Sequence, residues 1–357
     1  MPILNKRLLR PDVKKLQQRS QKIVTKGALE IAEKEGIDII KMLFIIADGN
    51  KRFYEILETG EGKTEDLYDL INRNQMKQLA KIFRGAMEYK GKILQEQYPL
   101  SPDVKIESVD AGRVPAEWQI SEGVDENKIL LYFHGGGHVL GSPMSSRPYT
   151  VEIGKAARVK VLSVDYALAP EHPFPEGPND CFTSYKWLLS NGYKPENIII
   201  GGASAGGNMT LAILIEIKEE GITMPKGAIV LSPGIDYTTN SKTILENAPT
   251  DCVMADVGVF WWIPAYLNGV DPNNPLACPI FADFTGFPSI LAQVSTSEMV
   301  YDHSTRLVEL AKAAGVNAIL QEWDNMPHVW QNYGLYDLPE AKEAIDKIGQ
   351  FIKDLFD

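Results

Sequence analysis

Hydrophobic residues follow one spacing in the first hundred positions and another in the rest, with the change at about Leu100-Ser101-Pro102. The first part is rich in Lys, Glu, Leu and Ile, has few prolines and lacks the alternation of a half-buried strand. This pattern predicts helices over residues 12–34, 37–58 and 64–97. Gly60 and Gly62 are expected to separate the second helix from the third.

From residue 101 onward, short apolar runs alternate with helical patterns, which is typical of a mostly parallel sheet covered by helices on both faces. The strands predicted for the whole chain are residues 128–133, 159–164, 197–200, 228–231, 290–294 and 318–323. The helices predicted between and after them span residues 179–190, 208–219, 304–314 and 339–356.

Between Asp236 and Phe287 this alternation stops, and an aromatic-rich segment (Phe260, Trp261, Trp262, Tyr266) takes its place. We interpret it as a helical insertion whose aromatic residues pack in a cap and can also line an apolar pocket. The predicted organisation is an α/β protein with an N-terminal helical region over residues 1–100 and a catalytic domain over residues 101–357. The cap insertion is expected at about residues 237–285.

Composition narrows the class of protein. The chain has 357 residues, of which 44% are apolar and 23% charged, as in an ordinary globular protein with a sizeable core. The formal charge of −11 disfavours nucleic acid as a partner, because phosphate binding needs clustered Lys and Arg. Cys181, Cys252 and Cys278 are few, odd in number and far apart, which suits a reducing compartment without a disulfide framework.

No stable membrane insertion is expected from the apolar segments. The longest run, Ile37 to Ala47, is interrupted by Asp38 and Lys41 and is too short to cross a bilayer, so we interpret it as a buried helix face. The first residues carry charges without a following apolar stretch and cleavage site, so no secretory signal is visible. A cytoplasmic location is the expectation.

The sharpest chemical signal is Gly202-Ala203-Ser204-Ala205-Gly206, directly after one predicted strand and before a predicted helix. A serine on such a tight strand-to-helix turn is held in a strained conformation with its hydroxyl exposed, and small residues two positions away let the backbones approach. Gly-x-Ser-x-Gly alone is a weak pattern, but this context strengthens it. Ser204 is therefore the candidate nucleophile.

A serine hydroxyl needs a base to become a good nucleophile, and His328 is the best placed of five histidines. It lies on a loop after a late predicted strand, whereas His134 and His138 flank glycines, His172 stands among prolines and His303 begins a helix. A base that follows the nucleophile and the acid in chain order is typical of hydrolases with this kind of serine turn.

The acid is expected after the penultimate strand, where Glu298 is the first candidate and Asp302 the rival. Glu298 stands at the predicted strand end and could accept the Nδ1 proton of His328. Asp302, one turn further on, is more naturally a capping residue in the first turn of the next helix.

Donors for an oxyanion are predicted in the run His134-Gly135-Gly136-Gly137. Glycines let backbone N–H groups point at a ligand, so the N–H groups of Gly136 and Gly137, with that of Ala205, are the candidates. Gly135 and His134 are expected to support this loop without a catalytic role.

These residues together resemble the hormone-sensitive-lipase-like (bHSL, type IV) carboxylesterases of the α/β-hydrolase fold. The resemblance runs from about residue 100 to the C-terminus and is carried by Tyr132–His138, Gly141-Ser142-Pro143, Asp165–Pro175, the Ser204 turn, Leu231-Ser232-Pro233 with Asp236, and Met326-Pro327-His328. It implies a triad of Ser204, an acid and His328, no cofactor or metal, and a helical cap. It also implies small-molecule ester substrates with short- to medium-chain acyl groups, and homodimers through a sheet edge.

Two positions depart from the family pattern. Ala203 stands where an acidic residue is usual, which is expected to alter local hydrogen bonding and not the chemistry. Glu298 stands where Asp is more frequent, as in a branch that includes lactone hydrolases. Residues 1 to about 70 have no counterpart in the resemblance.

Two other functions remain open on the sequence. A non-catalytic binding protein on the same scaffold, similar to the gibberellin receptor, would lack the base histidine, whereas this chain keeps both Ser204 and His328. An amidase or a lactonase would share the acylation chemistry, so the residues do not separate it from an esterase.

Overall fold

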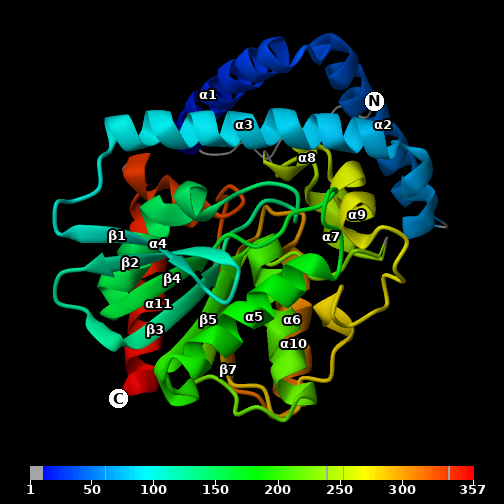
Figure 1. Cartoon of the computed structure of the whole chain (residues 1–357). Coiled ribbons are helices and arrows are strands. Elements are labelled where there is room, and N and C mark those ends of the chain that lie inside the picture. Colours follow the sequence, from blue (N-terminus) through cyan, green and yellow to red (C-terminus); the bar gives the residue numbers. More distant parts are fainter. Residues whose placement is uncertain (1–10, 61, 239, 252, 337) are drawn as a thin grey trace.

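An eight-stranded sheet forms the centre of the computed structural model, which describes residues 11–357 except 61, 239, 252 and 337 (Figure 1). Its strand order is β1-β2-β4-β3-β5-β6-β7-β8. Only the pairs β1–β2 and β2–β4 are antiparallel; all other neighbours run parallel. The strands are β1 (Val104–Asp110), β2 (Pro115–Ser121), β3 (Asp125–Phe133), β4 (Val159–Val164), β5 (Ile198–Ala203), β6 (Gly227–Leu231), β7 (Ser289–Ser295) and β8 (Ala318–Trp323).

Helices precede the sheet, connect its strands and close the chain. The α-helices are α1 (Pro11–Glu35), α2 (Ile39–Thr59), α3 (Arg73–Gln97), α4 (Pro143–Ala157), α5 (Glu176–Ser190), α6 (Ala205–Glu219), α7 (Lys242–Asn247), α8 (Met254–Val257), α9 (Val259–Leu267), α10 (Tyr301–Ala313) and α11 (Pro339–Phe356). Short 3-10 helices are η1 (Thr64–Asp69), η2 (Pro195–Asn197), η3 (Pro279–Phe281) and η4 (Trp330–Tyr336).

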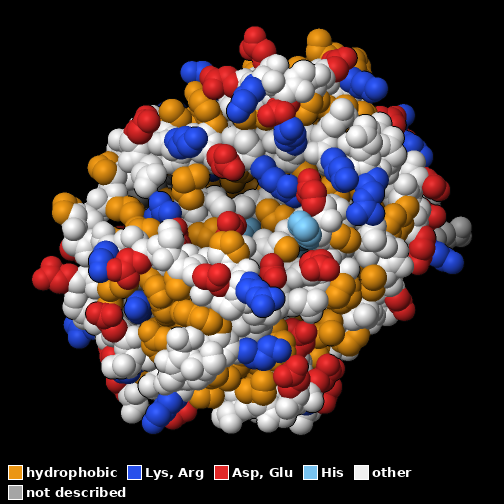
Figure 2. Space-filling model, viewed as in Figure 1, with side chains coloured by type: hydrophobic (Ala, Val, Ile, Leu, Met, Phe, Trp, Pro, Cys, Tyr) orange, Lys and Arg blue, Asp and Glu red, His pale blue; other side chains and the backbone are white. Residues whose placement is uncertain are grey.

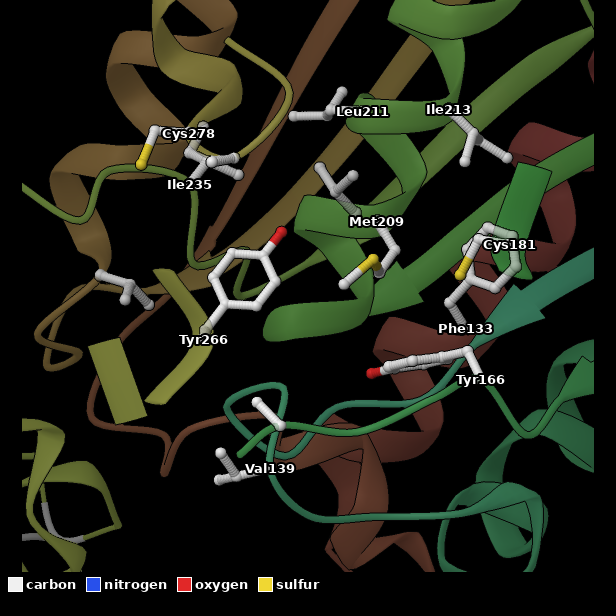
Figure 3. Packing of buried hydrophobic residues seen from close by; sticks show 14 of the residues in the cluster. Phe133, Val139, Tyr166, Cys181, Met209, Leu211, Ile213, Ile235, Tyr266 and Cys278 are labelled. Carbon is white, nitrogen blue, oxygen red and sulfur yellow. The ribbon is translucent and has the colours of Figure 1, made fainter. Parts of the chain in front are cut away.

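Both faces of the sheet are buried because alternate side chains of each central strand join different cores. In β3, Ile129, Leu131 and Phe133 pack toward α5, α6 and α10, whereas Leu130 and Tyr132 pack toward α4 and α11. The period of two in a strand produces this division. Figure 3 shows part of the first core, in which Phe133 lies near residues of α6 and α5 such as Met209 and Cys181.

The N-terminal helices lie over one edge of the sheet together with α7, α8 and α9 (Figure 1), and this group of helices is called the cap. α1 packs along α3, while α2 contacts α7 and α9. The region between Asp236 and Phe287 contains short helices and no strand among its described residues. None of the helices in the described part of the chain is long and apolar enough to cross a bilayer.

The predicted strand list was incomplete, because β1 and β2 form an antiparallel hairpin at the sheet edge. β2 contains buried polar residues, so its sequence lacks the apolar pattern expected of a strand. Glu117 accepts a hydrogen bond from Arg147 Nε at 2.8 Å, and Gln119 accepts one from Thr150 at 2.7 Å. Helix α4, which supplies both donors, also escaped prediction, and it contains Pro148.

The predicted helix over residues 64–97 is two elements, η1 and α3. Asn72 begins α3 with a capping box, in which its side chain accepts from Gln75 N at 3.0 Å and its own N–H donates to the Gln75 side chain. Gly60 ends α2 with φ of 67°, as its expected role required.

The interpretation of Ile37 to Ala47 as a buried helix face is only partly correct. Ile37, Ile39, Ile45 and Ile46 pack against the core as partly buried residues, but three other large apolar residues of the run do not. Met42 is the only residue of this run that is fully buried, while Ile40, Leu43 and Phe44 are 64%, 58% and 71% exposed. The run is apolar on both sides of α2, and only the side of Met42, Gly49 and Phe53 faces the protein.

Gly49 allows α2 to approach α9, and replacing it by Ala is expected to destabilise the protein by about 1–3 kcal/mol. An added Cβ would collide with the buried ring of Phe260, which cannot move freely in a packed core. Gly91→Ala in α3 is the control, because its Cβ would meet nothing closer than Met144 Cε at 3.6 Å. Since Ala is preferred over Gly in a helix, this variant is expected to be more stable than wild type. Thermal unfolding should show a lower Tm for Gly49→Ala and a higher Tm for Gly91→Ala than for wild type. A higher Tm for Gly49→Ala would contradict the packing.

Candidate active site

Ser204 lies on a strained turn between β5 and α6. Its φ of 53° and ψ of −117° are rare for a residue with a side chain. A Cβ at Gly202 would collide with the carbonyl of Gly206, and a Cβ at Gly206 with that of Phe133. The two glycines are therefore required by the close approach of backbones, as the pattern predicted.

His328 and Glu298 are in direct contact, each on a loop that follows a strand. The Nδ1 atom of His328, after β8, lies 2.6 Å from Oε2 of Glu298, after β7. Because Glu298 has no exposed surface, this bond is shielded from water. Glu298 Oε1 accepts two further hydrogen bonds, from Ser295 N at 2.7 Å and from Ser232 Oγ at 2.9 Å.

The electrostatics of the pair favour a charged histidine. Burial lowers the pKa of His328, but the hydrogen bond and charge of Glu298, with the charge of Asp251, outweigh this and raise that pKa above its ordinary value. Burial in turn raises the pKa of Glu298, against the opposing effect of His328. Glu298 thus stabilises the imidazolium form and fixes the ring orientation.

Asp302, the rival acid, is engaged elsewhere. It lies in the first turn of α10, and its carboxylate accepts hydrogen bonds from Ser241 Oγ and Thr243 Oγ1, both at 2.7 Å. It also accepts one from Lys242 N at 3.2 Å, so it holds the N-terminus of α7. The structure joins His328 to Glu298 and leaves Asp302 in this separate network.

A link through β6 joins the serine turn to the His–Glu pair. Leu231 O accepts from Ser204 N at 2.8 Å. The next residue, Ser232, contacts Glu298 and accepts from Val329 N at 3.4 Å, immediately after His328. The serine turn and the His328–Glu298 pair are therefore linked through the end of β6.

The glycine loop adjoins Ser204. A Cβ on Gly135 would lie 3.2 Å from Ser204 Cβ, and Gly136 and Gly137 have φ of 130° and 59°. Gly136 O accepts from Leu140 N at 2.9 Å, which closes the loop. Ala205 follows Ser204 at the start of α6. Gly137 and Ala205 line the same pocket as Ser204, and Gly136 stands between Gly135 and Gly137 in the loop.

Two other histidines hold this loop. His134 is stacked on Tyr166 with ring centroids 4.3 Å apart, its Nδ1 lies 2.9 Å from Gly135 O, and burial lowers its pKa to about 4. His138 stacks on Tyr266 at 3.6 Å and lies 2.5 Å from Tyr237 Oη, and burial lowers its pKa to about 3. Both rings are neutral and buried, which agrees with a supporting role.

A mostly apolar pocket opens beside Ser204 and has an empty volume of about 540 Å³, its open mouth included. Trp262 forms part of its wall and packs on the glycine loop, 2.7 Å from where a Cβ of Gly137 would lie. Of the aromatic group, Trp262 and Tyr266 line the pocket, whereas Phe260 and Trp261 are core residues of the cap. Other lining residues come from the cap and from the Glu298 loop, such as Ile244, Met254, Val259, Ile263, Met299 and Val300.

Cap residues also bind the loop that carries Glu298. Asn247 Nδ2 donates to Thr296 O at 3.1 Å and to Glu298 O at 2.8 Å. Thr250 Oγ1 donates to Ser297 O at 3.0 Å. Asp251 Oδ2 accepts from Met299 N at 2.9 Å. The cap therefore fixes the backbone on both sides of the candidate acid.

Sequence reasoning assigned no role to Ser232, Asn247 or Asp251. Ser232 stands in the Leu-Ser-Pro motif of the resemblance, which could have marked it. Asn247 and Asp251 lie about 50 residues before their partners and form no motif with them. Only the folded arrangement identifies them.

Comparisons with known proteins agree with this geometry. Residues 130–332 match the family described as alpha/beta hydrolase fold. An acetyl-hydrolase of Streptomyces hygroscopicus is 34% identical over 245 residues, which are 69% of this chain and 81% of that protein. An esterase of Acinetobacter venetianus is 33% identical over 261 residues, or 72% and 85% of the two chains.

Solved structures lead to the same group. A crystal structure of an esterase from the bacterial hormone-sensitive lipase (HSL) family is 36% identical, with a TM-score of 0.73. The similarity covers 80% of this chain and 100% of that one. The chain therefore belongs to the α/β-hydrolase fold family, within its group of bacterial hormone-sensitive-lipase-like esterases.

Proposed function

We propose that this protein is a carboxylesterase that hydrolyses short- to medium-chain acyl esters by two-step acyl transfer through Ser204. The observation that supports this most is the buried 2.6 Å bond between His328 and Glu298, linked through Ser232 to the serine turn. Its relatives named above are an acetyl-hydrolase and esterases.

In the first step His328 Nε2 takes the Ser204 proton while Oγ bonds to the ester carbonyl carbon. The tetrahedral oxyanion accepts hydrogen bonds from the N–H groups of Gly136, Gly137 and Ala205. The C–O bond to the alcohol then breaks, and the alcohol leaves with the proton from His328. An acyl group remains on Ser204.

In the second step water attacks the acyl carbon and gives its proton to His328. The acid is released when Ser204 Oγ leaves and recovers that proton. Glu298 remains ionised throughout, holds the imidazole tautomer that has its proton on Nδ1, and stabilises the imidazolium formed in both steps. No cofactor takes part in this scheme.

A p-nitrophenyl ester series from acetate to palmitate tests the proposal. Because the pocket is small and mostly apolar, kcat/KM is expected to peak at short or medium chains and to fall for palmitate. Matched lactone and p-nitroanilide substrates measure the competing activities. A folded protein that cleaves none of the esters would refute the proposed function.

Trp262 is expected to limit acyl length. Trp262→Ala should raise kcat/KM for the octanoate ester relative to the butyrate by about tenfold, the effect of about two further buried methylenes at about 0.8 kcal/mol each. Trp262→Phe is the control and should change the ratio little, because a ring still covers Gly137. An unchanged ratio in the Ala variant would place the acyl chain elsewhere.

Activity should be lost as the pH falls through the raised pKa of His328, because an imidazolium cannot accept the Ser204 proton. Asp251→Asn removes a negative charge that raises this pKa, so the acidic limb of kcat/KM is expected to move to lower pH. Asp324→Asn is the control. Asp324 lies on the His328 loop, but it is exposed and accepts a hydrogen bond from Thr296, so its replacement should leave the acidic limb of kcat/KM at the wild-type pH. A limb that stays fixed in Asp251→Asn would contradict this electrostatic role.

We also propose that residues 1–100 and the insertion at about 237–285 act together as the cap, while the rest of residues 101–357 is the catalytic domain. Contacts of α2 with α7 and α9 join the two cap segments. A homodimer through the sheet edge stays a prediction.

A further inference from the structure

The outer face of α2 carries an apolar patch beside a lysine. Ile40, Leu43 and Phe44 lie three and four residues apart, so they share one side of the helix, and each is more than half exposed. Lys41 is exposed beside them, and no described carboxylate forms an ion pair with it. These four residues are called the α2 patch. The α2 patch consists of exposed residues alone, so it does not rest on the proposed ester hydrolysis at Ser204.

Charge distinguishes this end of the molecule from the rest. Residues 11–59 contain nine Lys and Arg against eight Asp and Glu, whereas residues 60–357 contain 24 against 39. Figure 2 shows orange, blue and red side chains mixed along the upper rim, where α1, α2 and α3 lie in Figure 1. An anionic surface would repel the acidic body and could accept the α1–α2 end.

We propose that the α2 patch adsorbs the protein to an anionic lipid surface. Three exposed apolar side chains offer a few hundred Å², well below the roughly 800 Å² per partner of a stable protein interface. The α2 patch offers an exposed apolar stripe next to Lys41, and this pairing favours binding at the boundary between headgroups and acyl chains. The acidic neighbour Asp48 is itself paired with Arg52. An anionic membrane surface therefore fits the patch better than a second copy of the chain does.

The opposite side of α2 connects the patch to the pocket. Gly49 packs on Phe260 of α9, and Trp262 and Ile263 of the same helix line the pocket. Adsorption through the patch would hold the pocket wall one helix away from the lipid. Esters dissolved in the membrane would then be concentrated close to Ser204.

Vesicle sedimentation with the full-length protein tests the proposal. Vesicles of equal parts phosphatidylglycerol and phosphatidylcholine are expected to bind the protein at low salt, and less at high salt. The double variant Leu43→Ser/Phe44→Ser should reduce the partition coefficient at least tenfold. Leu310→Ser, a 44% exposed leucine on α10, is the matched control and should bind as wild type does.

Several outcomes would overturn the proposal: no binding by wild type, equal binding by the double variant, or equal binding to pure phosphatidylcholine. A wild-type dimer that the double variant converts to monomer in sedimentation velocity would assign the patch to a second copy instead. Unchanged turnover of dissolved p-nitrophenyl butyrate shows that the variants are folded, and Phe44→Ser alone replaces the double variant if that one does not fold. Absent turnover in wild type would refute the proposed function and leave the vesicle result to stand separately.

Discussion

Ser204→Ala is expected to lower kcat for p-nitrophenyl butyrate by roughly 10⁵-fold while leaving the fold intact. Alanine fits the same turn, but it has no oxygen to form the acyl intermediate. The oxyanion donors and the pocket remain, so a small rate above that of water is expected to persist. Stopped assays at high enzyme concentration, with thermal unfolding measured alongside, check both parts.

Ser190→Ala provides the control for the serine change, because this exposed hydroxyl donates to Trp187 O and accepts from Asn191 Nδ2 at the end of α5. It should retain wild-type kcat. A fluorophosphonate probe should label wild type and Ser190→Ala but not Ser204→Ala. Labelling of Ser204→Ala at the wild-type rate would remove Ser204 from the role of nucleophile.

Glu298→Gln is expected to reduce kcat by about 10³–10⁴-fold. The amide has the same shape, but its NH₂ group must face either His328 Nδ1 or the two donors Ser232 Oγ and Ser295 N. The first arrangement favours the wrong imidazole tautomer, and the second leaves a buried donor opposite other donors. Either way the imidazolium loses its counter-charge.

Asp302→Asn is the matched comparison for the acid. Its carboxylate holds the start of α7 and does not contact His328, so a loss of less than tenfold is expected, together with some loss of stability. Steady-state kinetics of the two variants side by side decide between the candidates. A greater loss in Asp302→Asn than in Glu298→Gln would move the acid to Asp302.

Local chemistry explains which parts of the structure were predictable. The central strands are buried on both faces, so they appear in the sequence as continuous apolar runs, and β4 and β8 have the predicted bounds. The turn at Ser204 needs small neighbours for steric reasons, and this requirement is visible within the five residues 202–206. The position of Glu298 followed from the end of β7, because strand ends meet at one edge of a parallel sheet.

Longer-range pairing explains what remained hidden. β2 contains Glu117 and Gln119, whose buried polarity is tolerable only because Arg147 and Thr150 arrive from α4. The first turns of α2 are apolar on two sides, and the packing of Met42, Gly49 and Phe53 against the protein decides which side faces inward. Such choices depend on partners far along the chain, so periodicity alone cannot resolve them.

The hydrogen bonds from residues 243–251 to the Glu298 loop limit how this enzyme can be recombined. Exchanging the whole insertion with that of a relative would replace Asn247, Thr250 and Asp251 while their acceptors and donors at residues 296–299 stayed behind. Such an exchange would alter the pocket wall and, at the same time, remove the hydrogen bonds that position the loop of Glu298. A chimaera library should place its crossover after Asp251, so that the helix bearing Trp262 can vary while the native loop anchors are inherited.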